Sequence, residues 1–131
     1  GIGKQLVAAM SGLTGGAGMA IIISAFIISQ VLRAAQGSTT VALVTTSAIF
    51  APVMASLPNV SPVLVALAIC AGGIGLSLPN DSGFWVVNRF SKFSVKQTMQ
   101  VWSAGGTVSG VTALIVLLII SALSGSLPGL F

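Results

Sequence analysis

The sequence predicts an all-α integral membrane protein. Hydrophobic residues make up 55% of its 131 residues, charged residues only 5%, and the mean hydropathy is +1.10. A soluble domain usually carries roughly 25% charged residues. The six charged residues also leave three long uncharged runs, at 5–32, 34–80 and 97–131. Because a bilayer-spanning helix needs about 20 apolar residues, each run can hold at least one span and the middle run two.

The first part of the chain predicts a helical hairpin. Residues 1–16 are rich in glycine and are typical of a short interfacial helix followed by a glycine-rich connection. Residues 17–36 are apolar over most of their length and form the first hydrophobic helix. Gly37 interrupts it, and the hydroxyl-bearing residues that follow can cap a second helix. We therefore expect a helical hairpin over 17–56 with its tip at 37–40.

The remainder predicts two further membrane segments. An interrupted transmembrane helix is expected over 62–90, with a break at 79–83, where Pro, Asn, Asp, Ser and Gly follow one another. Residues 91–102 mix aromatic and cationic side chains, which is typical of a membrane–water interface. A full-length apolar helix at 103–123 and a short tail at 124–131 complete the chain.

The cations predict the topology. Arg89, Lys92 and Lys96 lie on one side of the membrane, and Lys4 on the other, if the interrupted helix crosses once and the last helix crosses back. Cytoplasmic loops carry an excess of Lys and Arg. We therefore expect residues 89–102 to be cytoplasmic and the C-terminus to be periplasmic or extracellular.

The first polar interruption is a candidate anion site. Arg33 stands in an apolar stretch four residues before Gly37, and an arginine at a bilayer centre costs about 2.5–3.5 kcal/mol on insertion scales. At membrane depth, the free N–H groups of the helix that starts near Thr40 would attract an anion. Arg33 would then add a bidentate clamp for a carboxylate. The alternative is a surface loop in which Arg33 reaches the headgroups and Thr39 is only a cap.

The second interruption contains the sole acidic residue, Asp81. Inside a cavity Asp81 would titrate, which makes it a candidate proton carrier. Asn80 and Ser82 offer groups that can coordinate a substrate or a cation. The alternative is that Asp81 only caps a helix that begins near Gly83 at the interface.

The composition argues against several classes of function. The chain has no His, only one acidic residue and a single cysteine, Cys70, so it offers neither an acid–base pair nor metal-ligand spacing. We expect no enzymatic activity and no cofactor. Five scattered cations form no basic face for nucleic acid. Gly106 and Gly110 form a GxxxG pattern, which we expect to serve packing within the chain rather than a dedicated dimer contact.

Three strings of residues carry a resemblance to a known family. They are Arg33-Ala-Ala-Gln-Gly-Ser-Thr-Thr-Val-Ala, Ala48-Ile-Phe-Ala-Pro52 and the more specific Asn80-Asp81-Ser82-Gly83-Phe84-Trp85. Together with the aromatic and basic stretch that leads to Trp102, they resemble the carboxy-terminal part of the gluconate permease family, whose members are gluconate:proton symporter-like proteins of the ion-transporter superfamily. The likeness covers nearly all of this chain but only about the last third of a family member.

The resemblance implies a fold and a transport function. The fold is one inverted-repeat half of a secondary transporter, in which a re-entrant helical hairpin and an interrupted helix meet near the membrane middle, beside full transmembrane helices. The function is proton-coupled symport of a small hydroxylated carboxylate across the bacterial inner membrane, namely gluconate, a related sugar acid or, in some members, D-serine. The residues expected to bind substrate are Arg33, Gly37, Ser38, Thr39, Thr40, Asn80 and Ser82, and Asp81 is expected to couple the proton.

The expected partners follow from the same resemblance. They are the carboxylate and protons, the lipid bilayer, the remainder of the permease with its missing N-terminal repeat, and further copies in a homo-oligomer; nucleic acid is not among them. Two alternatives belong to other classes. One is a small self-assembling channel-like or accessory membrane subunit, and the other is a subunit that lends only helices to a membrane enzyme.

Overall fold

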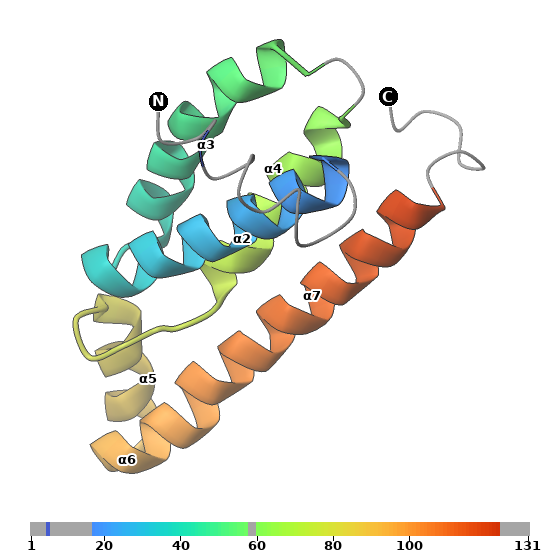
Figure 1. The fold of residues 1–131 in the computed structure, drawn as a ribbon. Helices are drawn as coiled ribbons and strands as arrows, with labels where there is room; N and C mark the ends of the chain where they lie inside the picture. The colour runs from blue at the N-terminus through green and yellow to red at the C-terminus, as the bar shows by residue number, and fades with distance from the viewer. Residues whose placement is uncertain (1–4, 6–16, 58–59, 124–131) are drawn as a thin grey trace.

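The computed structural model describes residues 5, 17–57 and 60–123, and all regular structure in them is helical (Figure 1). The helices are α2 (Ala17–Gln36), α3 (Thr39–Ala55), α4 (Pro62–Ile74), α5 (Ser82–Ser91), α6 (Val95–Thr98), the π-helical η1 (Met99–Ser103) and α7 (Ala104–Ala122). Apart from Gln5, the expected interfacial helix and glycine-rich connection lie outside the described residues, as does the C-terminal tail.

Helices α2 and α4 form the centre of the packing, since they contact each other and both contact α3 and α7 (Figure 1). The approach of α4 to α2 is close. A Cβ on Gly72 would collide with the carbonyl oxygen of Phe26, and Ser29 Oγ donates a hydrogen bond to Ile69 O at 2.7 Å. Small residues that let helix backbones approach are typical of membrane helix packing, where water does not drive association.

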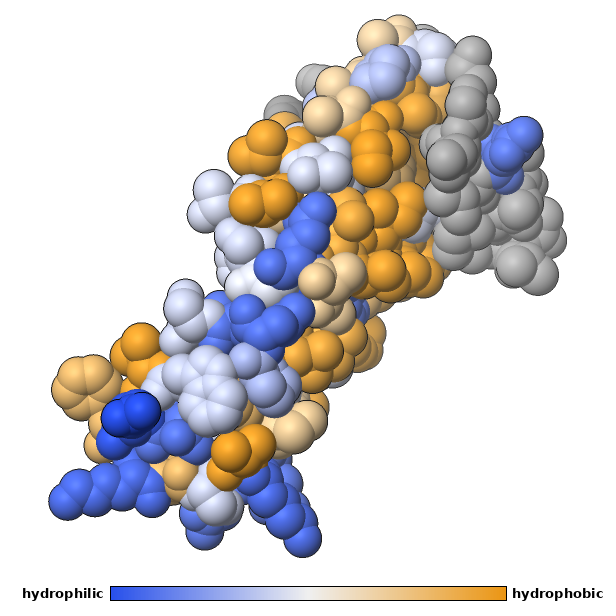
Figure 2. Space-filling model, turned by 90° about the vertical axis from the view of Figure 1, so that its left-hand side faces the viewer, coloured by the Kyte–Doolittle hydropathy of each residue, from blue (hydrophilic) through white to orange (hydrophobic). Residues whose placement is uncertain are grey.

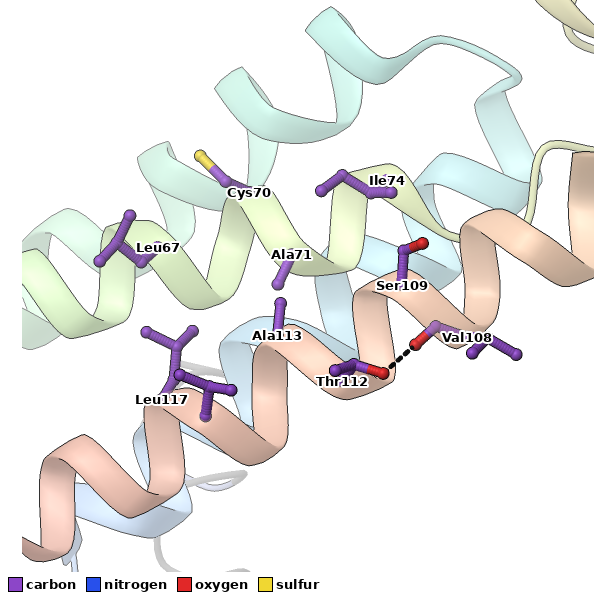
Figure 3. A pocket seen from close by; sticks show the side chains of 10 residues that line it. Leu67, Cys70, Ala71, Ile74, Val108, Ser109, Thr112, Ala113 and Leu117 are labelled. Atoms are coloured by element: carbon purple, nitrogen blue, oxygen red, sulfur yellow. Dashed lines mark hydrogen bonds between the residues drawn. The ribbon is translucent and has the colours of Figure 1, made fainter.

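Glycines also bring α7 close to α4. A Cβ on Gly106 would lie 3.0 Å from Ile74 O, and one on Gly110 would lie 2.7 Å from Ala71 O. The GxxxG pattern therefore serves a contact within the chain, and this expectation is confirmed. Beside this contact, side chains of α4 and α7 line an open apolar groove of about 620 Å³ (Figure 3).

The last long helix is longer than the sequence analysis expected. Helical structure begins at Val95 and continues through η1 and α7 to Ala122, so residues 95–102 are part of the helix. A capping box starts it: Ser94 Oγ accepts from Gln97 N at 3.2 Å, and Gln97 Oε1 accepts from Ser94 N at 2.9 Å. The S-x-x-Q spacing is a known helix-start signature that hydropathy alone does not register.

In the part of the chain that the structure describes, two helical stretches are long and apolar enough to cross a membrane, Gly18–Gln36 and Val95–Ala122. Helices α3 and α4 are apolar but shorter. Figure 2 shows hydrophobic side chains over the upper part of the molecule and hydrophilic ones gathered at the lower end, where α5 and α6 lie in Figure 1. This separation of apolar body and polar end is consistent with a membrane protein.

Candidate functional site

The two helix breaks lie against each other. Gly37, between α2 and α3, has a φ of +67°, and a Cβ there would collide with the backbone carbonyl of Asn80, between α4 and α5. Asn80 Nδ2 donates to Ala34 O at 2.7 Å and to Ala35 O at 3.4 Å. The amide thus satisfies carbonyls left free at the end of α2. Both the positive φ and the close approach require glycine at position 37.

Arg33 and Asp81 join the same two breaks through a buried ion pair. Arg33 Nη2 lies 2.5 Å from Asp81 Oδ2, and the two residues are only 6% and 7% exposed. Arg33 Nε also donates to Gly73 O at 3.2 Å, in the last turn of α4. The surface-loop alternative required Arg33 to extend to the headgroups, but its side chain is buried in this ion pair. Removing one partner of such a pair leaves a buried charge uncompensated, which typically costs about 3–5 kcal/mol.

Asp81 accepts hydrogen bonds from three directions. Its Oδ2 accepts from Arg33 and, at 2.5 Å, from Ser77 Oγ, and its Oδ1 accepts from Gly83 N at 3.0 Å. Hydrogen bonds of this kind favour the ionised carboxylate. Asp81 is the N-cap of α5, as the capping alternative expected, and it is at the same time the counterion of Arg33, which that alternative did not include.

One donor of Arg33 is left over. Its Nη1 is buried and has no hydrogen-bond partner among the described residues. Arg33 also lines a pocket of about 490 Å³, together with Thr39, Gly73, Ile74, Ser77, Val101, Trp102, Gly105, Gly106 and Ser109. An unsatisfied buried donor on a charged group is costly, and a carboxylate is the acceptor that a guanidinium matches in shape and charge.

Side chains at the start of the last helix form hydrogen bonds with the second break, between α4 and α5. Trp102 Nε1 donates to Ser77 Oγ at 3.0 Å, Ser103 Oγ donates to the carbonyl of Ser77, and Leu76 N donates to Thr107 Oγ1 at 3.2 Å. The π-helical turn η1 contains Trp102 and Ser103, and such turns occur frequently at functional sites. Sequence reasoning did not place these side chains in the site. The available signal was a set of small polar residues inside apolar helices.

Comparison with known proteins decides the family. A family model described as GntP family permease matches residues 1–123. The chain belongs to the GntP permease family. The expected resemblance to gluconate permeases is thereby confirmed.

Individual relatives support the same family assignment. The chain is 38% identical to the inner membrane permease YgbN of Escherichia coli K12 over 88% of this chain and 25% of that protein. It is 39% identical to a gluconate permease of Pseudomonas aeruginosa over 76% of this chain and 22% of that protein. It is 34% identical to the D-serine transporter DsdX of Escherichia coli K12 over 71% of this chain and 21% of that protein. No solved structure matches.

The chain spans a quarter or less of the length of these relatives. Its membership of the GntP permease family points to a transporter rather than an enzyme. The family and the two apolar helices together support a bacterial inner-membrane protein. Among the described residues, no group of three or more His, Cys, Asp or Glu side chains could hold a metal ion.

The expected substrate residues of this GntP chain fall into different places. Arg33 and Thr39 line the pocket, while Gly37 and Asn80 form the contact between the breaks. The pocket wall on α7 was not among the expected residues. The pocket therefore combines part of the predicted site with residues of a helix that the sequence analysis treated as a plain transmembrane span.

The remaining expected residues do not line this pocket. Ser38 is the N-cap of α3 and accepts from Val41 N at 3.4 Å, so the cap is Ser38 rather than Thr39. Thr40 and Ser82 are exposed, in the first turns of α3 and α5. Their hydroxyls are therefore available to another part of a permease or to a ligand outside the pocket.

Proposed function

We propose that this chain is part of a permease that carries a small hydroxylated carboxylate, such as gluconate, a related sugar acid or D-serine, across the inner membrane together with a proton. The observation that carries this proposal is the buried guanidinium of Arg33, which has one donor without a partner among the described residues and lines a pocket beside the two helix breaks. The printed functions of the gluconate permease and D-serine transporter relatives support the choice of substrate class.

Arg33 binds the substrate carboxylate. Nη1 is closed off from the surface, so a carboxylate reaches it only when the guanidinium turns or the break beside it moves. Thr39, at the start of α3, lines the same pocket, and the positive end of that helix dipole adds attraction for an anion. The carboxylate thus meets a charge and a helix N-terminus together.

Asp81 couples the proton to the substrate. With neither ligand bound, the Arg33–Asp81 pair is electrically neutral. A carboxylate alone would leave the buried site with a net negative charge, and a proton on Asp81 alone would leave it with a net positive charge. Both are costly in a low-dielectric surrounding. For a monovalent sugar acid such as gluconate, protonation of Asp81 together with carboxylate binding to Arg33 keeps the site neutral, which favours symport of one proton with one anion.

The two breaks move as one unit during transport. The ion pair and the Asn80 amide, which donates to Ala34 O, tie the end of α2 to the loop before α5. Alternating access would carry this unit relative to other parts of the permease. The breaks lie at membrane depth in this proposal, residues 89–102 are cytoplasmic, and the C-terminus is on the opposite side. Assembly with the remainder of the permease and into a homo-oligomer completes the pathway.

The alternative of a small self-assembling subunit has less support. It would use glycine-rich helices as contacts between copies, and two glycines of the last helix, Gly106 and Gly110, are used against α4. Cross-linking in native membranes separates the two functions, because discrete homo-oligomers of a 13.0 kDa chain would favour the alternative.

The test of the proposed function is uptake by the full-length permease in proteoliposomes with an inward proton gradient. Arg33→Lys is expected to lower uptake of labelled gluconate at least tenfold, because an ammonium cannot serve Asp81 and a carboxylate with a planar fork. Arg89→Lys, an exposed cation at the polar end, is the matched control and should transport like the wild type. Uptake by Arg33→Lys at the wild-type rate would rule out the clamp.

Membrane depth is tested by thiol labelling of Ser38→Cys and Ser82→Cys. The exposed thiol of Cys70 is replaced first, together with any other cysteine of the permease. We expect poor access of bulky impermeant reagents in at least one transport condition, with a change when substrate is added. Free access under every condition would place the breaks at the surface.

A further inference from the structure

One wall of the pocket that Arg33 lines comes from η1 and the first turns of α7. Trp102 in η1, and Gly105 and Ser109 in α7, line it. Residues four apart lie on the same helix face, so Gly105 and Ser109 form a short strip along the pocket. The volume of about 490 Å³ lies within the range of roughly 300–1,000 Å³ that small-molecule sites occupy.

Gly105 has no packing reason to be glycine within the described residues. A Cβ added there would meet nothing within 4 Å, whereas those on Gly106 and Gly110 would press against carbonyl oxygens of α4. Its φ is not in the left-handed region either. Glycine inside a helix is unfavourable relative to alanine, and at Gly105 the missing side chain leaves open space. That space is in the pocket.

The two neighbours of Gly105 on this wall suit a hydroxylated carbon chain. Trp102 is held in place by its indole hydrogen bond to Ser77, and 43% of its surface is exposed. A fixed aromatic ring can pack against the C–H groups of a polyol. Ser109 Oγ donates to Gly105 O at 2.9 Å, so its lone pairs remain able to accept from a substrate hydroxyl.

Beyond Ser109 the lining becomes mainly apolar. Ser109 and Ile74 also line the groove between α4 and α7, whose further lining includes Thr112 and the apolar Leu67, Ala113 and Leu117. In Figure 3, Ser109 and Ile74 lie at one end of this groove, while Leu67 and Leu117 lie at the other. A hydroxylated chain that passed Ser109 would meet the hydroxyl of Thr112 and otherwise apolar side chains, so most of its hydroxyls would lose their hydrogen-bonding partners.

We propose that Trp102, Gly105 and Ser109 bind the hydroxylated tail of the substrate and limit its length, while Arg33 holds the carboxylate. This inference rests on the proposed function, since it presupposes that the pocket takes a carboxylate at Arg33. It adds to the proposed function that η1 and α7 discriminate between long and short acids. Gly105 provides the room for the chain, Trp102 packs against its C–H groups, and Ser109 accepts a hydrogen bond near the end of the polar wall.

The experiment measures competition in the full-length permease. Unlabelled glycerate, threonate and gluconate, with three, four and six carbons, compete with labelled gluconate for uptake. Gly105→Ala is expected to raise the inhibition constant of gluconate at least tenfold and to change that of glycerate less than twofold, because the added methyl group fills the space of the longer chain. Ser109→Ala should weaken gluconate about fivefold, the usual effect of one lost hydrogen bond, and glycerate hardly at all.

Gly18→Ala is the matched control. A Cβ there also meets nothing within 4 Å, and Gly18 lies on α2, outside the lining of the pocket. It should behave like the wild type, and quantitative blots report the amount of each variant in the membrane. Because alanine favours the helix at both positions, neither variant is expected to fail to fold.

Several outcomes would overturn the inference. An equal loss of gluconate and glycerate in Gly105→Ala would assign Gly105 to a contact with another part of the permease, and unchanged constants for both acids would remove it from the site. Arg33→Lys could leave uptake intact while Gly105→Ala still shifts the preference toward short acids. This result would overturn carboxylate binding by Arg33 and support length selection by the pocket wall. A permease that takes up none of these acids would overturn the proposed function and this inference together.

Discussion

The junction of the two breaks and the interface between α4 and α7 use polar atoms in opposite ways. At the junction, the ion pair of Arg33 and Asp81 and the amide of Asn80 hold distant segments together, and one donor of Arg33 has no partner among the described residues. At the interface, Gly106 and Gly110 let two apolar helices approach. Close apolar packing can persist through a transport cycle, whereas a charge pair can exchange a partner for a proton or an anion. The contrast separates the part of the chain suited to switching from the part suited to support.

The largest effect is expected from removing the carboxylate of the junction. Asp81→Asn leaves the buried charge of Arg33 uncompensated and removes the proposed proton-coupling group, so gradient-driven accumulation should fall about 100-fold. Substrate exchange, which requires no net proton movement, should fall less than tenfold. Both rates are measured in the same proteoliposomes. Equal loss of accumulation and exchange would assign Asp81 to capping or packing.

The next effect concerns the contact of the two breaks. Gly37→Ala places a methyl group against the carbonyl of Asn80 in a backbone conformation that costs a residue with a Cβ about 1–2 kcal/mol. We expect a melting temperature several degrees lower in detergent, and slower uptake. Gly18→Ala is the control, since its methyl group meets open space. A wild-type melting temperature for Gly37→Ala would mean that the breaks are not in contact in the assembled permease.

The supporting interface should respond differently. Gly110→Ala places a Cβ 2.7 Å from Ala71 O and forces α4 and α7 apart. We expect this overpacking to lower the free energy of unfolding by about 1–3 kcal/mol and the melting temperature with it. The ratio of the inhibition constants of gluconate and glycerate should stay unchanged, because Gly110 does not line the pocket. A shift in that ratio would mean that the interface between α4 and α7 also affects which acid is bound.

The smallest effect is expected far from both regions. Ser94→Ala removes the capping box at the start of the last helix and should lower stability by about 1 kcal/mol. Uptake should be unchanged, since Ser94 is exposed and contributes to neither the junction nor the pocket. The melting temperature and the uptake rate are measured on the same preparation. A large loss of uptake would implicate the polar end of the molecule in transport.

Local signals indicated much of the helical structure. Gly37 and Ser38 separate α2 from α3 because glycine accepts a positive φ and a serine hydroxyl caps the next helix. Asp81 caps α5 for a similar reason. Other helix ends differ from expectation: α4 ends at Ile74, ahead of the Pro79 that marked the expected break, since Gly75 is in an extended conformation and Leu76 has a positive φ.

The candidate site was only partly predictable. Arg33 and Asp81 were singled out because charges are rare in this chain, but as a substrate clamp and a proton carrier considered separately. Their pairing joins residues 48 positions apart, and no local pattern encodes it. Ser77, Trp102 and Thr107 carry no charge, and their contribution became visible only when α7 was placed beside the break.

The sequence by itself determined that the chain is helical, apolar and interrupted twice by small polar residues, because hydropathy, capping and backbone preference act over a few neighbouring residues. Only the tertiary structure decided that the two interruptions touch, that Arg33 keeps one donor without a partner among the described residues, and that the first turns of α7 form the other wall of the pocket. These features depend on the packing of helices distant in the chain, where backbone approach at single glycines sets which side chains meet.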